Sequence, residues 1–272
     1  LTHAMTTVST GGFSTHDESL GYYEGWHVLW VAIIFMIAGA LPFSFFIAIF
    51  FARNLPRYDP QIAVFFTLII LSCAIVLFAD GWDHAKNFTQ FSQYIFNVIS
   101  ILTTTGYAAG NFMDYGGIGA TLFFFLIFIG GCAGSTSGGI KIYRFIVLSQ
   151  LIRTSLKELM YSRSFFLMRY GKQIIDKDAF RSSMVMICCF FVFLALFTII
   201  LGALGLDFIT ALSGSATALA NVGPGIGDII GPSGSFSALE DSEKYVLVFA
   251  MIIGRLELLV ALALFVPLLW RD

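Results

Sequence analysis

The hydrophobic residues of this chain fall into long runs that short polar segments separate. Five runs are long enough, or nearly so, to cross about 30 Å of hydrocarbon, which takes about 20 helical residues. They are Trp26 to Phe51, Gln61 to Ala79, Gly117 to Gly130, Ser182 to Leu206 and Lys244 to Trp270. The third is short and needs the residues after it to complete a crossing. The pattern predicts an all-α integral membrane protein.

Three runs of small and hydroxyl residues, each ending in glycine, lie beside these spans. They are Ser9-Thr10-Gly11, Thr104-Thr105-Gly106 and Asn221-Val222-Gly223. Short half-polar helices at Gln93 to Leu102 and Phe208 to Leu219 are predicted before the last two. One such run alone is also what an ordinary helix end with a glycine cap looks like. Such runs build a membrane helix poorly and expose backbone carbonyls well.

The glycine runs recur within a repeated unit of span, short re-entrant helix, glycine run and span. Gly106 follows Gly11 by 95 positions, and Gly223 follows Gly106 by 117. A unit repeated in one orientation predicts quasi-rotational symmetry about a central axis. We expect residues 1–52 to hold the end of one unit, 61–160 a whole unit with a broken last span, 161–181 a linker, and 182–272 the last unit.

Non-helical backbone persists at membrane depth where it is buried in protein or lines a water-filled path. Three such loops on one axis predict a pore. The short helices point their negative C-terminal ends at a passing cation, and glycine permits the positive φ that turns carbonyls inward. A closed carbonyl ring of this kind has four walls and the chain supplies three. Since the chain begins at Leu1 and not at methionine, we expect the fourth wall from an upstream segment or another chain.

Composition and charge agree with a membrane location. Hydrophobic residues make up 58% and charged residues 12% of the 272, which excludes a water-soluble globule, and a net charge of −2 gives no basis for nucleic-acid binding. Twelve of the 15 basic residues lie on one side of the spans: Arg53, Arg57, Lys141, Arg144, Arg153, Lys157, Arg163, Arg169, Lys172, Lys177, Arg181 and Arg271. The other side is acidic, with Asp17, Glu18, Glu24, Asp80, Asp83, Asp114, Asp228, Glu240, Asp241 and Glu243. The positive-inside rule makes the basic loops cytoplasmic, so the glycine runs open to an external face that favours cations.

Two features interrupt the spans. Glycine occupies five of the ten positions from 130 to 139, and such a cluster breaks a helix, either as a packing kink or as a functional loop. Arg255 lies near the middle of the last span, where a charge costs at least about 2.5 kcal/mol without water or a partner. Glu257, two positions on, points elsewhere on the helix. Arg255 is therefore either satisfied by carbonyls of a neighbouring helix, or faces the pore and repels cations or anchors the 130–139 loop.

Taken as a set, four motifs resemble the Trk/Ktr/HKT family of potassium transporters. They are Val8-Ser9-Thr10-Gly11-Gly12-Phe13-Ser14, Thr103-Thr104-Thr105-Gly106-Tyr107, the stretch from Gly130 to Lys141, and Asn221-Val222-Gly223-Pro224-Gly225. The family has four pore repeats, so the resemblance implies a quasi-fourfold fold of which this chain carries the end of the second repeat and all of the third and fourth.

The resemblance also implies a function: potassium uptake across the bacterial cytoplasmic (inner) membrane. K⁺ ions, with no covalently bound cofactor, would occupy a filter formed by Ser9, Thr10, Gly11, Thr104, Thr105, Gly106, Asn221, Val222 and Gly223. A gate would be formed by Gly131, Gly134, Ser135, Thr136, Ser137, Gly138, Gly139 and Arg255. The implied partners are membrane lipid, a second copy in a homodimer, and a cytosolic nucleotide-binding ring of the TrkA type.

Other functional classes fit less well. The stretch Gly134 to Lys141 superficially suggests a phosphate-binding loop, but Ile140 spoils the Walker spacing. A serine hydrolase needs a base near Ser135 or Ser137, whereas every histidine maps to the opposite side. We therefore expect no enzyme. The remaining alternative is a broken-helix secondary transporter that couples another solute to Na⁺ or H⁺. Such proteins usually have inverted repeats and intramembrane carboxylates, whereas these repeats are parallel.

Overall fold

The protein is almost entirely helical. The computed structural model describes residues 1–23, 25–51, 59–79, 87–161, 168–171, 173–256 and 258–263. Its α-helices are α1 (Thr2–Val8), α2 (Trp26–Ala40), α3 (Phe43–Phe50), α4 (Pro60–Ala79), α5 (Phe88–Leu102), α6 (Gly116–Ile127), α7 (Ile142–Met160), α8 (Lys177–Ala203), α9 (Phe208–Ala220), α10 (Asp241–Arg255) and α11 (Leu258–Ala263). Short 3₁₀ helices are η1 (Ser19–Tyr22), η3 (Phe112–Asp114) and η4 (Phe236–Ala238), and β1 (Arg169–Tyr170) pairs antiparallel with β2 (Gln173–Ile174).

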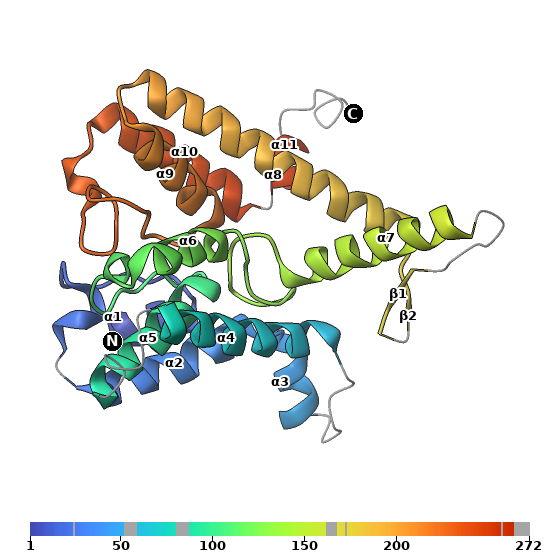
Figure 1. Cartoon of the computed structure of the whole chain (residues 1–272), viewed down its shortest axis with the longest axis horizontal. Helices are drawn as coiled ribbons and strands as arrows, with labels where there is room; N and C mark the ends of the chain where they lie inside the picture. The colour runs from blue at the N-terminus through green and yellow to red at the C-terminus, as the bar shows by residue number, and fades with distance from the viewer. Residues whose placement is uncertain are drawn as a thin grey trace.

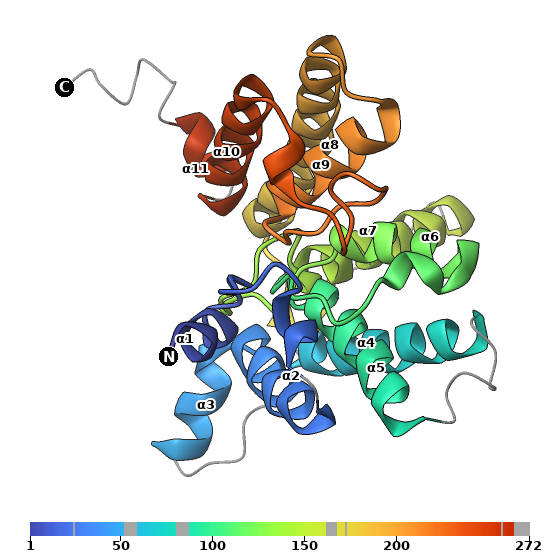
Figure 2. The ribbon, with the colours of Figure 1, turned by 90° about the vertical axis from the view of Figure 1, so that its left-hand side faces the viewer.

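The helices surround a centre where loops from distant parts of the sequence meet. Figure 1 shows the helices side on, with α7 and the β1–β2 hairpin extending to one end. Seen from the opposite end, the groups α1–α2, α4–α5, α6–α7 and α8–α10 lie around the middle, and the loops after α1, α5 and α9 converge there (Figure 2). This arrangement fits the expected rotation of repeats about an axis.

Among the described residues, two single helices, Pro60–Ala79 and Asp178–Ala203, are long and apolar enough to span a membrane, and α2 with α3 passes the same test as a bent pair. The expected span from Trp26 to Phe51 is therefore not one straight helix, because α2 and α3 meet at 97°. Pro42 supplies the reason, since proline lacks the N–H that would continue the helix. The carbonyls freed at Gly39 and Ala40 accept from Thr136 N (3.2 Å) and Cys132 N (3.0 Å).

The last expected span, Lys244 to Trp270, is also not one straight helix in its described part. Helix α10 ends at Arg255, Leu256 follows in a turn, and α11 begins at Leu258. Two starts differ from the expected boundaries as well, because α5 begins at Phe88 and α8 at Lys177, inside the expected linker. Sequence pattern places such ends less well than it places the helices themselves.

Helices α5 and α9 are the most deeply packed polar elements. Every residue from Phe96 to Leu102 and every residue from Ser213 to Ala220 is buried, although both stretches contain hydroxyl side chains. The N-terminus of α9 is capped by Asp207, whose Oδ2 accepts a hydrogen bond from Thr210 N at 3.1 Å. Ser100 Oγ donates to Tyr107 O and Ser213 Oγ to Ile226 O, whereas the buried Ser215 Oγ has no hydrogen-bond partner among the described residues. The C-terminal ends of both helices lie at the centre of the molecule (Figure 2).

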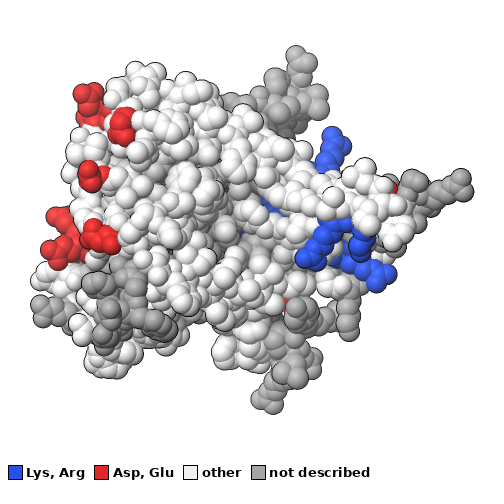
Figure 3. Space-filling model, in the orientation of Figure 1, with Lys and Arg blue, Asp and Glu red and all other residues white. Residues whose placement is uncertain are grey.

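Charge is segregated along the long axis. In Figure 3 the acidic side chains gather at the end formed by the loops near η1 and η4, and the basic ones at the opposite end over α7. The charged residues Glu24, Arg53, Arg57, Asp80, Asp83, Lys86, Arg163, Lys172, Glu257 and Arg271, together with His84, lie outside the described residues. The described charges follow the division expected from the sequence.

Candidate functional site

The three glycine runs adopt one shared backbone conformation. Each follows the C-terminus of a helix, and each contains a left-handed residue other than glycine: φ is 50° at Thr10, 56° at Thr104 and 54° at Asn221. Two positions later a glycine again has positive φ: 68° at Gly12, 83° at Gly106 and 122° at Gly223. Only glycine takes such angles without strain. The three runs are therefore structurally equivalent.

The backbone hydrogen bonds repeat with the same spacing. Gly11 N donates to Thr6 O at 2.7 Å, Thr105 N to Ser100 O at 2.9 Å, and Val222 N to Thr217 O at 3.0 Å. The next N–H returns to the same residue in each case: Gly12 to Thr6 O, Gly106 to Ser100 O, and Gly223 to the hydroxyl of Thr217. The N–H groups of the runs thus point back into the helix ends.

This register corrects one expectation. Gly11 was paired with Gly106 and Gly223 as the positive-φ glycine, but Gly12 is the residue with that conformation. The equivalent triplets are Thr10-Gly11-Gly12, Thr104-Thr105-Gly106 and Asn221-Val222-Gly223, and Ser9 corresponds to Thr103. Aligning the aromatic residues Phe13 and Tyr107 that follow would have found it.

Neighbouring runs pack backbone against backbone around the centre. A methyl group added at Gly12 would lie 1.8 Å from Thr105 O, and one at Gly106 would lie 1.7 Å from Val222 O. At Gly223 the nearest atom is Gly106 O, at 3.7 Å. The runs therefore follow one another in the order 12, 106, 223, and the far side of Gly223 has no neighbouring run among the described residues.

The carbonyl oxygens of the runs are left unpaired by the protein. Within the described residues, no backbone carbonyl at positions 10–12, 104–106 or 221–223 accepts a protein hydrogen bond. Thr10, Thr104, Thr105 and Val222 are nonetheless buried. Buried carbonyls normally have partners, so a cluster without them is suited to replacing the hydration shell of a cation.

The loop from 130 to 139 packs directly against the runs. Gly138 N donates to Thr104 Oγ1 at 2.6 Å, and Thr10 Oγ1 donates to Thr136 Oγ1 at 3.1 Å. A methyl group at Gly138 would lie 2.3 Å from Ala220 O. The loop thus touches all three runs, which come from three separate repeats.

Two basic side chains hold the same loop by its carbonyls. Arg255 Nη1 donates to Thr136 O at 3.0 Å, and Lys141 Nζ donates to Ser137 O and, at 3.4 Å, to Ser135 O. Lys141 was not among the residues expected here, although it follows the loop directly in sequence. The carbonyl that Arg255 contacts belongs to the loop, as one of the two possibilities for this residue expects, and not to a neighbouring helix.

Other residues of the loop make contacts within the loop and with α3. Gly134 O accepts from Phe43 N at 2.9 Å, and Ser135 Oγ donates to Cys132 O at 2.6 Å. A methyl group at Gly131 would meet Ser137 Oγ at 2.5 Å, and Gly139 lies beside Gly130. These residues fold the loop and seat it on α3, whereas Thr136 and Gly138 make its contacts with the runs.

Two ionisable groups outside the spans have shifted pKa values. The hydrogen bonds from Thr210 lower the pKa of Asp207 at the start of α9. Burial, and then the hydrogen bond to Asp59, raise the pKa of Tyr170 in β1 well above its usual range. Asp207 therefore stays ionised as the cap of α9, and Tyr170 stays protonated and attaches the hairpin to the start of α4.

Together the helices and the converging runs define a helical membrane protein built from pore-loop repeats. Residues 1–271 match the TrkH family of cation transport proteins. The chain is 42% identical to the Trk system potassium uptake protein TrkI of Halomonas elongata over 100% of its own length and 56% of that protein. It is 31% identical to TrkH of Vibrio parahaemolyticus, over 100% of this chain and 57% of the relative.

A solved structure of a TrkH protein has the same fold. The crystal structure of the potassium transporter TrkH from Vibrio parahaemolyticus superimposes with a TM-score of 0.90 at 30% identity, covering 99% of this chain and 58% of that one. This chain belongs to the TrkH family. It spans just over half the length of the relatives that it matches.

Proposed function

We propose that this chain forms three walls of a potassium-selective pathway across the bacterial cytoplasmic membrane, through which K⁺ is taken up. The observation that carries the proposal is the set of backbone carbonyls at positions 10–12, 104–106 and 221–223, which accept no hydrogen bond among the described residues although Thr10, Thr104, Thr105 and Val222 are buried. Rings of such carbonyls can replace the hydration shell of a monovalent cation. The relatives that the chain matches are potassium uptake proteins, and this favours K⁺ as that cation.

The orientation follows from charge. The acidic end, onto which the runs open, would face outside and concentrate cations at the mouth, and the basic end with α7 would face the cytoplasm. C-terminal ends of α1, α5 and α9 add negative dipole potential at the filter. By family resemblance, the full-length protein would work as a homodimer in the lipid bilayer with a cytosolic nucleotide-binding ring of the TrkA type on its basic side.

The loop from 130 to 139 is proposed as the gate, in its closed arrangement. Its support is position, because it lies against all three runs through Thr136 and Gly138. Arg255 would hold it there by the bond to Thr136 O and would also repel cations below the filter. Opening would break these contacts and move the loop off the axis.

The test is an uptake measurement on the full-length protein reconstituted in lipid vesicles. With K⁺ inside and a trace of labelled Rb⁺ outside, flux that follows the K⁺ gradient alone supports the proposal. Uptake that requires a Na⁺ or H⁺ gradient would instead support a coupled secondary transporter. No cation flux above protein-free vesicles would contradict both.

A further inference from the structure

Tyr107, the residue directly after Gly106, joins two walls of the site. Its side chain is fully buried, and its hydroxyl lies 2.6 Å from Thr6 Oγ1 and 3.2 Å from Thr7 Oγ1. It also donates to His3 O at 3.2 Å. All three partners belong to α1, about 100 positions earlier in the chain. One phenol therefore bridges the second and third repeats at the level of the glycine runs.

Each end of this bridge is attached to the backbone of a run. On α1, Thr6 O accepts hydrogen bonds from Gly11 N (2.7 Å) and Gly12 N (3.4 Å), and Thr7 O accepts one from Thr10 N at 3.2 Å. At the other end, Tyr107 O accepts from Ser100 Oγ at 2.7 Å, and Ser100 O accepts from Thr105 N at 2.9 Å. A shift of the phenol would move both runs.

The bridge has no counterpart at the equivalent positions of the other walls. Phe13 follows Gly12, is 65% exposed and has no hydroxyl, and Pro224 follows Gly223.

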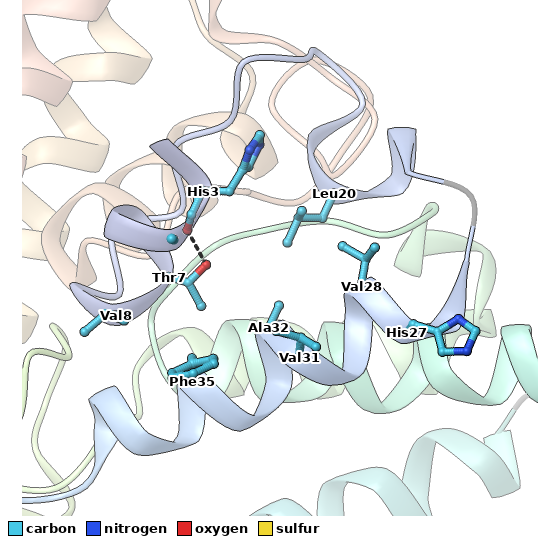
Figure 4. Close-up of a pocket in the computed structure, with 10 residues that line it drawn as sticks. His3, Thr7, Val8, Leu20, His27, Val28, Val31, Ala32 and Phe35 are labelled. Atoms are coloured by element: carbon cyan, nitrogen blue, oxygen red, sulfur yellow. Dashed lines mark hydrogen bonds between the residues drawn. The ribbon is translucent and has the colours of Figure 1, made fainter. Parts of the chain in front are cut away.

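Helix α1 is only seven residues long. On the α2 side of α1 lies a mostly apolar cavity of about 420 Å³ (Figure 4), and His3 and Thr7 of α1 line it beside Val28, Val31 and Ala32 of α2. Packing toward α2 therefore leaves room for α1 to shift, and the bonds to Tyr107 resist that shift.

We propose that Tyr107 is a positioning residue for ion selectivity: its hydroxyl sets the spacing between the carbonyls of the second and third walls. The proposal rests on the proposed function, since it assumes that these carbonyls select K⁺. A smaller ion such as Na⁺ is excluded when the carbonyls cannot close around it. Removing the bridge lets the second wall relax toward the cavity, so the ring adapts to Na⁺ more readily.

The test is the K⁺/Na⁺ permeability ratio of Tyr107→Phe in the full-length protein, measured from reversal potentials under bi-ionic conditions. We expect the ratio to fall roughly 3- to 10-fold, the range that one buried hydrogen bond covers. The matched control is Tyr115→Phe, which also loses a buried hydroxyl bond, the one from Asn97 Nδ2 at 2.8 Å, but within a single repeat. Its ratio should stay at the wild-type value.

Thr6→Val removes the same bond from the opposite side and should lower the ratio in the same direction, without adding to the effect of Tyr107→Phe in the double variant. If Tyr107→Phe does not assemble, the permeability ratio of Thr6→Val alone tests the role of the bridge. A selective wild type with unchanged ratios in Tyr107→Phe and Thr6→Val overturns the bridge alone, as does an equal loss in Tyr115→Phe. A wild type without K⁺ preference overturns the proposed function.

Discussion

Arg255 Nη1 donates a 3.0 Å hydrogen bond to the carbonyl oxygen of Thr136, 119 positions earlier in the chain. The Thr136 hydroxyl accepts a hydrogen bond from the Thr10 hydroxyl and donates one to Gly39 O at 3.0 Å. The end of α10 and the end of α2 are thus tied to one residue of the loop. A single loop position therefore connects the ends of α2 and α10 with the run at Thr10.

Arg255→Ala should raise basal cation flux. A hydrogen bond from a charged donor contributes about 1.5–3 kcal/mol, so its loss shifts the equilibrium of the loop toward the open state by a factor of roughly 10 to 100. The removed positive charge acts in the same direction. Tracer flux through vesicles containing the full-length variant measures it, with Arg153→Ala, an exposed arginine of α7, as the control. Flux equal to that of the wild type would contradict a role for Arg255 in the gate.

Thr104→Val should also open the loop, by a different contact. The substitution keeps the side-chain shape but leaves the Gly138 N–H buried without its 2.6 Å acceptor, at a cost of about 1–3 kcal/mol. Basal flux should rise in the same assay. Thr198→Val is the matched control, because among the described residues the Thr198 hydroxyl bonds only to Leu194 O of its own helix. If both variants conduct like wild type, the loop is not held closed through Thr104.

Gly254→Ala should disturb the packing of α10 on the end of α9. A methyl group there would lie 2.0 Å from Leu219 O, a backbone atom that cannot move without shifting the run at Asn221. Gly202→Ala in α8 meets nothing within 4 Å and should stabilise its helix slightly. Thermal unfolding of the detergent-solubilised protein compares the two, and an equal melting temperature for both variants would argue against this contact.

The sequence predicts much of this architecture because the signals are local. Length and apolarity predict α4 and α8, and the half-polar pattern before Gly106 and Gly223 predicts the helix ends that converge at the centre. Pro42 could have predicted the bend between α2 and α3. The residues around it are apolar on both sides, however, so the hydrophobic pattern alone does not mark the bend.

What the sequence could not give depends on contacts between distant repeats. Gly12, and not Gly11, is the glycine equivalent to Gly106, as its positive φ and its closeness to Thr105 O show. The sequence does not distinguish the two glycines, because they are adjacent in a Gly-Gly pair. The end of α10 at Arg255 has no proline or glycine after it to mark it. The attachment of the loop to Thr10, Thr104 and Arg255 joins residues up to 126 positions apart, which periodicity does not reach.

The most direct test of the account is the permeability sequence for K⁺, Rb⁺, Na⁺ and Li⁺ through the full-length protein, for wild type, Gly106→Ala and Gly110→Ala. Both glycines have positive φ, 83° and 76°, so both substitutions place a side chain on a left-handed backbone. Only the methyl group at position 106 strikes a neighbouring wall, 1.7 Å from Val222 O, because position 110 has open space within 4 Å. The account predicts that wild type and Gly110→Ala favour K⁺ and Rb⁺ over Na⁺ and Li⁺, and that Gly106→Ala loses this preference. Retained selectivity in Gly106→Ala would contradict it.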